Sequence, residues 1–310
     1  MIDHDPIKMS ARAVSKHVHL IDAPYQGESG VLGTYIVKGE FSMVVDPGPT
    51  VSAPFIIKAL EENGVSSELL RYVAPTHIHL DHAAGSWKLL ERYTKADLLV
   101  HPRGARHMND PSKLEAGARQ LFGDTVSGYG EIRGVPAERV VESQDGLELD
   151  LGGLTVRVIW TPGHATHHQC YFVPEDEAII VGDAGGFFSP ETGLIMPTTP
   201  PPFNPPQAIE SLDALIALEP EIICYGHFGS AGKAVEKLEA HRRQISLWSR
   251  IAGKGCEEGM NPREIYEKIR SEDQMATLIE YSPEMRERSP VISVLGFLRY
   301  HEWARSKQRA

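Results

Sequence analysis

A short polar segment, THIHLDH at residues 76–82, concentrates side chains that bind metal ions. It offers three imidazoles and a carboxylate, and it follows an apolar stretch that predicts a strand. Imidazole nitrogens and carboxylate oxygens suit zinc, iron and manganese. If strand geometry persists one step further, His77 and His79 point to the same side, and Asp81 and His82 turn towards a second position. The bland alternative is a histidine-rich surface loop that binds nothing.

Three further candidate ligands each follow a predicted strand or its turn. His164 comes after Thr161-Pro162-Gly163, Asp183 after the apolar run IIVG, and His227 after IICYG. Residues at the ends of strands in one sheet converge on a common rim, where sites of α/β proteins usually lie. One metal ion does not need this many ligands, so the density predicts two ions. The candidate ligands are His77, His79, Asp81, His82, His164, Asp183 and His227.

The elements that position these residues change along the chain. Up to about residue 195 the pattern predicts short strands with a few helices between them. Residues 196–206 (MPTTPPPFNPP) contain six prolines and are predicted to be irregular, either as a linker or as a rigid loop over a site. Four helices are predicted in the remainder, at Gln207–Leu218, Lys233–Ala252, Pro262–Ser271 and Glu284–Ser306.

This motif set resembles that of the metallo-β-lactamase fold superfamily, over about residues 15–230. The resemblance implies an α/β fold, an αββα sandwich of two mixed β-sheets flanked by helices, followed by a C-terminal α-helical extension at 231–310. It also implies that Asp46 orients a ligand histidine, although a plain turn carboxylate is the alternative. By the same resemblance, the first metal ion is held by His77, His79 and His164, the second by Asp81, His82 and His227, and both by Asp183.

The chemistry expected of two such ions is hydrolysis by a shared hydroxide, because each metal lowers the pKa of bound water towards about 7. Zinc is the first expectation, with iron or manganese as alternatives. Asp81 and Asp183 are the candidate catalytic residues that pass a proton to the leaving group. An Asp183 bridge resembles the lactonase, thioesterase and phosphodiesterase branches, whereas residues 183–190 lack the glyoxalase II signature. The substrate is then a small ester, lactone, thioester or phosphoester.

Two other classes of function remain open at this point. One is a mononuclear iron oxidoreductase resembling the persulfide dioxygenases, which use only a His-His-Asp subset of these ligands. The other is a non-catalytic metal-binding scaffold, against which the intact ligand set weighs. The predicted substrate pocket is bounded by Phe187, Phe188 and the proline-rich loop 196–206, with the segment 102–111, which contains His107, on the opposite side. Core or loop anchors are an equal alternative for the two phenylalanines, and a structural histidine is the favoured interpretation of His107.

The composition of the chain limits which partners and which cellular compartment we expect. A net charge of −11 disfavours nucleic-acid binding, which needs clustered Lys and Arg. The three cysteines are sparse and odd in number, and the first residues lack a signal-peptide pattern, so we expect a cytoplasmic protein. No apolar stretch approaches the length of a membrane span.

The last predicted helix, Glu284–Ser306, is apolar around nearly its whole circumference between residues 291 and 298. Such a helix must be buried on more than one side. One side is expected to pack on Lys233–Ala252, and the other to roof the site or to meet a second subunit. We expect a homodimer, since two-fold pairs are the commonest closed assembly. A deeply buried helix in a monomer is the alternative.

Overall fold

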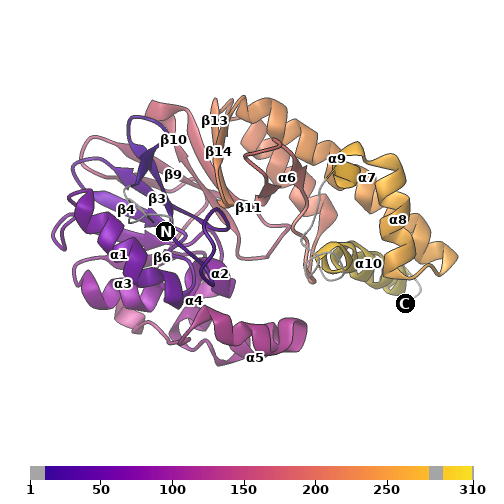
Figure 1. Cartoon of the computed structure of the whole chain (residues 1–310), viewed down its shortest axis with the longest axis horizontal. Coiled ribbons are helices and arrows are strands. Elements are labelled where there is room, and N and C mark those ends of the chain that lie inside the picture. The colour runs from indigo at the N-terminus through magenta and orange to yellow at the C-terminus, as the bar shows by residue number, and fades with distance from the viewer. Residues whose placement is uncertain (1–10, 279–288, 309–310) are drawn as a thin grey trace, which may run out of the picture.

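Two mixed β-sheets pack face to face, with helices on both outer faces (Figure 1). The computed structural model describes residues 11–278 and 289–308. In the first sheet, neighbours follow chain order, the first three pairs being antiparallel and the last three parallel. Its strands are β1 (Arg12–Ala13), β2 (Val18–Asp22), β3 (Gly33–Lys38), β4 (Ser42–Val45), β5 (Leu70–Ala74), β6 (Asp97–Val100) and β7 (Val140–Glu142).

The second sheet has one parallel pair among antiparallel ones. In spatial order its strands are β14 (Ser230–Gly232), β13 (Ile222–His227), β11 (Ala178–Phe188), β10 (Gln169–Val173), β9 (Thr155–Trp160) and β8 (Glu148–Asp150), while β12 (Ile195–Met196) pairs with β11. The parallel pair β11–β13 shifts register on both sides of Gly182. Such irregularities re-aim side chains, and here they occur beside Asp183.

Helices cover the two outer faces. Figure 1 shows α1 and α3 beside the first sheet, and α6 and α7 beside the second. The helices are α1 (Ala53–Glu62), α2 (Leu80–Ala83), α3 (Ser86–Arg92), α4 (Pro102–Asn109), α5 (Ser112–Phe122), α6 (Pro205–Ile216), α7 (Ala234–Glu258), α8 (Pro262–Glu272), α9 (Gln274–Leu278) and α10 (Ser289–Gln308). The predicted αββα fold with a C-terminal helical part is confirmed. Among the described residues, no helix is both long and apolar enough to cross a membrane.

Three large apolar clusters hold these layers together. The inter-sheet cluster joins Tyr35 of β3 to Tyr171 of β10, both fully buried. A second cluster fills the space between the first sheet and helices α1 and α3. The third extends from Ile179 of β11 to Trp248 of α7 and Val294 of α10. The C-terminal helices therefore share a core with the second sheet, and the proposed division at residues 230 and 231 stays a prediction.

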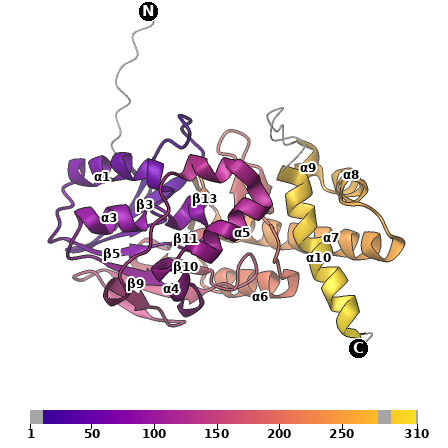
Figure 2. The ribbon, with the colours of Figure 1, turned by 90° about the horizontal axis from the view of Figure 1, so that it is seen from below.

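Two segments differ from the prediction or extend beyond it. The proline-rich segment is irregular in the middle, but its ends are not, because Met196 closes β12 and Pro205 opens α6. Proline is well tolerated in a first helical turn, where its missing N–H has no partner to lose. For the last predicted helix, residues 284–288 lie outside the described residues. The described part forms α10, which crosses α7 (Figure 2). Its Phe297 ring packs 6.0 Å from that of Trp248, confirming the predicted contact with Lys233–Ala252.

Candidate metal centre

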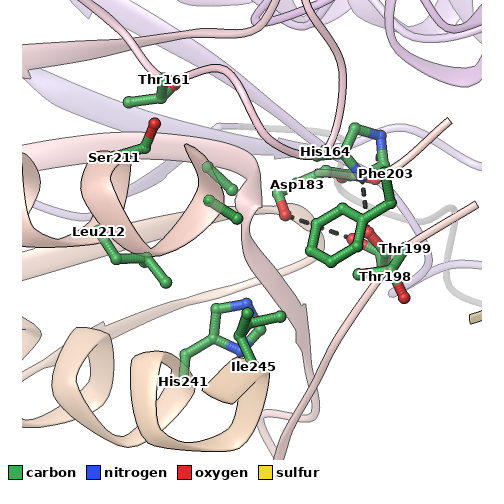
Figure 3. A pocket seen from close by; sticks show the side chains of 12 residues that line it. Thr161, His164, Asp183, Thr198, Thr199, Phe203, Ser211, Leu212, His241 and Ile245 are labelled. Carbon is green, nitrogen blue, oxygen red and sulfur yellow. Dashed lines mark hydrogen bonds and ion pairs between the residues drawn. The ribbon is translucent and has the colours of Figure 1, made fainter. Parts of the chain in front are cut away.

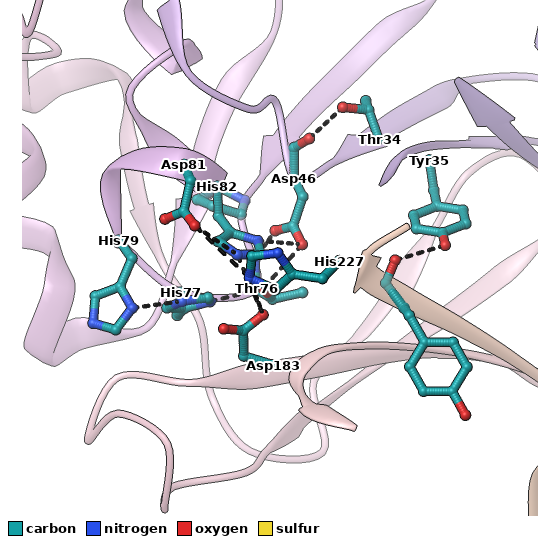
Figure 4. A network of polar contacts seen from close by, with 12 residues as sticks. Thr34, Tyr35, Asp46, Thr76, His77, His79, Asp81, His82, Asp183 and His227 are labelled. Carbon is teal, nitrogen blue, oxygen red and sulfur yellow. Dashed lines mark hydrogen bonds and ion pairs between the residues drawn. The ribbon is translucent and has the colours of Figure 1, made fainter. Parts of the chain in front are cut away.

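The polar segment 76–82 leaves β5 and turns into the short helix α2 at Leu80. Beside it, β4 ends in a tight turn at Asp46, whose φ is +52°. Aspartate tolerates this left-handed conformation better than most residues. Thr34 on β3 stabilises the turn by donating its hydroxyl to the Asp46 carbonyl oxygen at 2.7 Å (Figure 4). The first sheet therefore fixes both Asp46 and the polar segment at one edge.

Three imidazole nitrogens converge on one point. His79 Nδ1 lies 2.9 Å from His77 Nε2 and 3.0 Å from His164 Nε2, although His164 follows β9 in the other sheet. The Thr76 hydroxyl donates to Asp46, so it accepts from His77 Nδ1 at 3.1 Å. His77 therefore presents the Nε2 lone pair to the group. These three residues form one set that could hold a metal ion.

A second set lies beside the first. His82 Nε2 is 3.7 Å from Asp81 Oδ2, and His227 Nε2 is 3.8 Å from the same oxygen. The carboxylate of Asp81 is 24% exposed, whereas His82 is buried. The two histidines are positioned by different sheets. His82 lies in α2, which follows β5 of the first sheet, and His227 ends β13 of the second. This set of three could also hold a metal ion.

The carboxylate of Asp183 lies between the two sets. Its Oδ1 is 3.3 Å from His82 Nε2 and 3.4 Å from His227 Nε2. Its Oδ2 is directed to the other set, 3.5 Å from His164 Nε2. Asp183 can therefore offer one oxygen to each set, which is the arrangement of a bridging ligand. The structure thus brings all seven candidate ligands together, while their roles as ligands stay a prediction.

One observation indicates that these residues are suited to bind metal ions. His82 Nε2 and Asp183 Oδ1 are fully buried and face each other at 3.3 Å, yet neither makes a well-formed hydrogen bond within the part of the chain that the structure describes. A buried polar atom without a partner costs about 1–3 kcal/mol. Coordination of a cation would satisfy both atoms at once. Imidazole and carboxylate donors match zinc, iron or manganese equally well.

Outer partners fix the orientation of the ligand rings. Asp46 accepts a hydrogen bond from His82 Nδ1 at 3.0 Å and another from the Thr76 backbone N–H at 2.6 Å. The predicted contact between Asp46 and a ligand histidine is therefore present. On the other side of the centre, His164 Nδ1 donates to the Thr198 carbonyl oxygen at 2.6 Å. Each bond leaves the Nε2 of its ring free to face a metal ion.

His168 contributes a contact that the sequence did not predict. It lies just before β10 and is fully buried. Its Nε2 accepts from the Ala184 backbone N–H at 3.3 Å, and its Nδ1 donates to Thr161 at 2.7 Å. Its ring also stacks on His77 with 5.0 Å between centroids. His168 therefore supports two candidate ligands, His77 directly and Asp183 through the neighbouring residue.

The protonation of the histidine cluster follows from burial. Burial lowers the pKa of His77 and His79 well below the usual value, and the surrounding imidazoles lower both further. The pKa of His164 is also lowered, again chiefly by burial. All three rings are therefore neutral near pH 7, which is the form that coordinates a cation.

In the second set, nearby carboxylates raise the pKa of a histidine instead of leaving it lowered by burial. Burial alone would lower the pKa of His82, but Asp183 and Asp46 outweigh it and hold that pKa well above its usual value. Burial would raise the pKa of Asp183, but the facing imidazoles of His227 and His82 hold it well below its usual value. Asp183 is thus ionised and ready to bind a cation. The charge of a bound metal would itself replace the protons on these histidines.

The residues predicted to line a substrate pocket lie in different surroundings. Phe187 lies near the centre, its ring 6.2 Å from that of His227. Phe188 is buried and stacks on Tyr225 at 4.5 Å, so its position matches the alternative of a core anchor. His107 on α4 accepts a hydrogen bond from the neighbouring Arg106. A role for these three in substrate binding stays a prediction.

A small cavity lies behind the centre, between the second sheet, α6, α7 and the proline-rich loop (Figure 3). Asp183 and His164 reach it from the metal side, and Thr198 and Phe203 line it from the loop. His241 of α7 closes it from below, and burial lowers the pKa of that imidazole to about 4.

Comparisons with known proteins agree with this geometry. A family model described as the metallo-beta-lactamase superfamily matches residues 27–227. The metallo-beta-lactamase fold-containing protein ST1585 of Sulfurisphaera tokodaii is 34% identical over 181 residues, which are 57% of this chain and 66% of that protein. A hydroxyacylglutathione hydrolase of Acidiphilium cryptum is 32% identical over 193 residues, 62% of each chain. The chain thus spans just under two thirds of the length of these relatives.

One solved structure extends the likeness beyond the matched segment. The crystal structure of ST1585 from Sulfolobus tokodaii, described as an archaeal metallo-beta-lactamase superfamily protein, superposes with a TM-score of 0.71. The superposition covers 91% of this chain and 98% of that one at 24% identity. At that identity the likeness supports the fold alone.

Proposed function

Because the chain belongs to the metallo-β-lactamase superfamily, we propose that it is a metal-dependent hydrolase that holds two divalent metal ions, zinc first among them. The observation that carries this proposal is the Asp183 carboxylate, with one oxygen facing each set of candidate ligands. A mononuclear iron oxidoreductase needs neither the second set nor the bridge. A metal-binding scaffold without activity could use a single set and would not need the bridge.

The chemistry that a bound metal pair supplies is a water made acidic enough to act as a nucleophile near pH 7, together with polarisation of the scissile carbonyl or phosphoryl group. The residues of this chain would hold the metal ions and orient the histidine ligands. Asp46 and the Thr198 carbonyl fix two imidazole rings by their Nδ1 atoms. We propose that Asp81, whose carboxylate is partly exposed, or Asp183 passes a proton to the leaving group. Hydrolysis then ends with an acid, and an alcohol or a thiol, released.

We propose a small ester, lactone, thioester or phosphoester as the substrate class. Among these, the thioester draws support from the hydroxyacylglutathione hydrolase relative, since the name of that protein describes thioester cleavage. Phe187, beside His227, offers an apolar surface for an acyl or aryl group. We further propose that the protein acts as a cytoplasmic homodimer, on the composition and on the apolar last helix.

The test is elemental analysis of the purified protein, combined with a panel of thioesters, lactones, aryl esters and phosphodiesters. We expect two metal ions per chain at saturation and turnover of at least one substrate that a chelator abolishes. One ion per chain, with Asp81 and His82 replaceable without effect, would remove the two-metal proposal. Oxygen consumption with a persulfide by a one-iron protein would favour the oxidoreductase.

A further inference from the structure

Helix α10 forms hydrogen bonds with the proline-rich loop on both sides of Thr198. The Thr199 hydroxyl donates to the Ser293 carbonyl oxygen at 2.7 Å, and the Ser293 hydroxyl donates to the Pro197 carbonyl oxygen at 3.0 Å. Thr199 is buried, with 2% of its surface exposed. The residue between these two contacts, Thr198, is the one whose carbonyl accepts from His164.

A glycine one turn further along α10 allows this close approach. A Cβ atom built on Gly296 would lie 1.9 Å from the Thr199 carbonyl oxygen and 2.9 Å from Phe203 Cβ. Neither a backbone oxygen nor a Cβ atom can move without moving the loop. The next residue, Phe297, packs edge to face on Phe203 with 4.8 Å between ring centroids. The backbones of the helix and the loop are therefore in close contact at Gly296.

On its inner side the loop has less support. The cavity shown in Figure 3 lies there, lined by Thr198, Thr199 and Phe203 of the loop and by His241 and Ile245 of α7. Side chains bordering a cavity lose part of their packing contacts. Besides the two bonds of Thr198 to His164 and Asp183, residues 197–199 are held by the hydrogen bonds and the backbone contact that α10 supplies from the other side.

The loop in turn controls two candidate ligands. Thr198 accepts from His164 Nδ1 at 2.6 Å through its carbonyl, and its hydroxyl donates to the Asp183 carbonyl oxygen at 3.3 Å. Partners of this kind fix the tautomer and the orientation of a ligand ring, and their loss typically weakens metal binding 10- to 100-fold. A shift of the loop would reach the centre by this route.

We infer that α10 is a positioning element of the metal centre, acting through Ser293 and Gly296 on the Thr198 carbonyl and thereby on His164. The inference rests on the proposed function, because it takes His164 to be a metal ligand. Among the residues that the structure describes, the candidate ligand sets contain no residue of α10. Ser293 and Gly296 are therefore positioning residues, and their replacement should change metal retention before it changes the fold.

The experiment compares three loop-side variants, at the contact between α10 and the loop, with one control at a contact between α10 and α7. Ser293→Ala and Thr199→Val each remove one hydrogen bond between α10 and the loop, and Gly296→Ala inserts the clashing methyl group. The control, Ser249→Ala, removes the 3.1 Å contact between Ser249 Oγ and His301 Nε2, which joins α7 to α10 away from the loop. Each full-length variant is loaded with zinc, and zinc release to excess chelator and the melting temperature are measured.

We expect the loop-side variants to release one of the two zinc ions about 10-fold faster than the wild type, and the control to stay within about 2-fold. A second readout uses metal-free protein, in which ¹⁵N signals of the His164 imidazole report its Nδ1–H bond to Thr198. The loop-side variants should shift these signals and the control should not. If Gly296→Ala does not fold, the two hydrogen-bond variants decide.

The inference is overturned if Ser293→Ala and Thr199→Val retain zinc and the imidazole signals as the wild type does. It is equally overturned if release rates of all four variants follow the melting temperature, because α10 would then act only through global stability. A wild type that binds no zinc, iron or manganese would instead refute the proposed function. The imidazole signals of the metal-free variants would still report whether α10 positions His164.

Discussion

The two sides of the metal centre hold their histidines with different kinds of partner. On the sheet side, His82 donates from Nδ1 to the carboxylate of Asp46 at 3.0 Å. On the loop side, His164 donates from Nδ1 to the neutral backbone carbonyl of Thr198 at 2.6 Å. Asp46 directly follows a buried strand, whereas Thr198 lies in a loop without regular structure.

This difference teaches where the centre is rigid and where it can be adjusted. Asp46 is tied to the same segment it orients, because it also accepts from the Thr76 N–H and hydroxyl. The residues on both sides of Thr198 form hydrogen bonds with α10, an element that lies outside both sheets. A change in the first sheet must disrupt a core to reach a ligand, while a change in α10 needs only to move a loop.

The largest effect is expected at Asp183, which joins the two sides. Asp183→Ala removes both oxygens, and Asp183→Asn keeps the shape but loses the charge. We expect both variants to fold, to retain at most one metal ion per chain and to lose more than about 100-fold in turnover, since a ligand should matter more than its outer partner. Metal analysis, circular dichroism and kinetics on the best substrate measure this. Two retained ions with near wild-type rates would contradict the bridging role.

The next effect concerns the carboxylate partner of His82. Asp46→Asn removes the charge that orients the ring, and we expect zinc affinity to fall about 10- to 100-fold at one of the two sites. Competition with a chromophoric chelator measures it. Asp213→Asn is the matched control, because Asp213 is exposed and forms a surface ion pair with Arg242. Equal affinities in the two variants would show that Asp46 does not support the centre.

The sequence predicted the sheet side better than the loop side. The pattern H-x-H-x-D-H after an apolar strand predicts the metal ligands of this side, because residues at strand ends gather at one edge of a sheet. Asp46 also stands at the end of a strand, between Val45 and Pro47. Thr198 carries no such signal, since a backbone carbonyl is chemically the same in every residue. Only tertiary placement gives it a role.

Glycines caused a further gap in the prediction. The strand predicted before Asp183 continues in the structure to Phe188, although it contains Gly182, Gly185 and Gly186. Gly182 has a φ of +48° and accompanies the register shift that exposes Asp183 to both ligand sets. In a sequence, such glycines indicate the end of a strand as readily as a bulge within one.

A pH effect on stability is expected from the loop side. Burial lowers the pKa of His241 from about 6.5 to about 4, so the unfolded chain binds more protons between these values. His241 therefore contributes its full stability above about pH 6.5 and loses it as the pH falls towards 4. Between pH 7 and pH 5 the loss amounts to about 2 kcal/mol. His241→Gln should reduce the pH dependence by this amount in urea unfolding of metal-free protein, and an unchanged dependence would contradict the lowered pKa.

The smallest effect is expected from a change that mirrors one of the loop-side variants. Thr34→Val, like Thr199→Val, removes one hydroxyl that donates to a backbone carbonyl at 2.7 Å, and both threonines are 2% exposed. Each should cost about 1 kcal/mol of unfolding free energy. Thr34 supports the Asp46 turn, but Asp46 keeps its bonds to Thr76 and His82, so zinc release should change less than about 2-fold. Faster release from Thr34→Val than from Thr199→Val would reverse the comparison, making the sheet side the adjustable one.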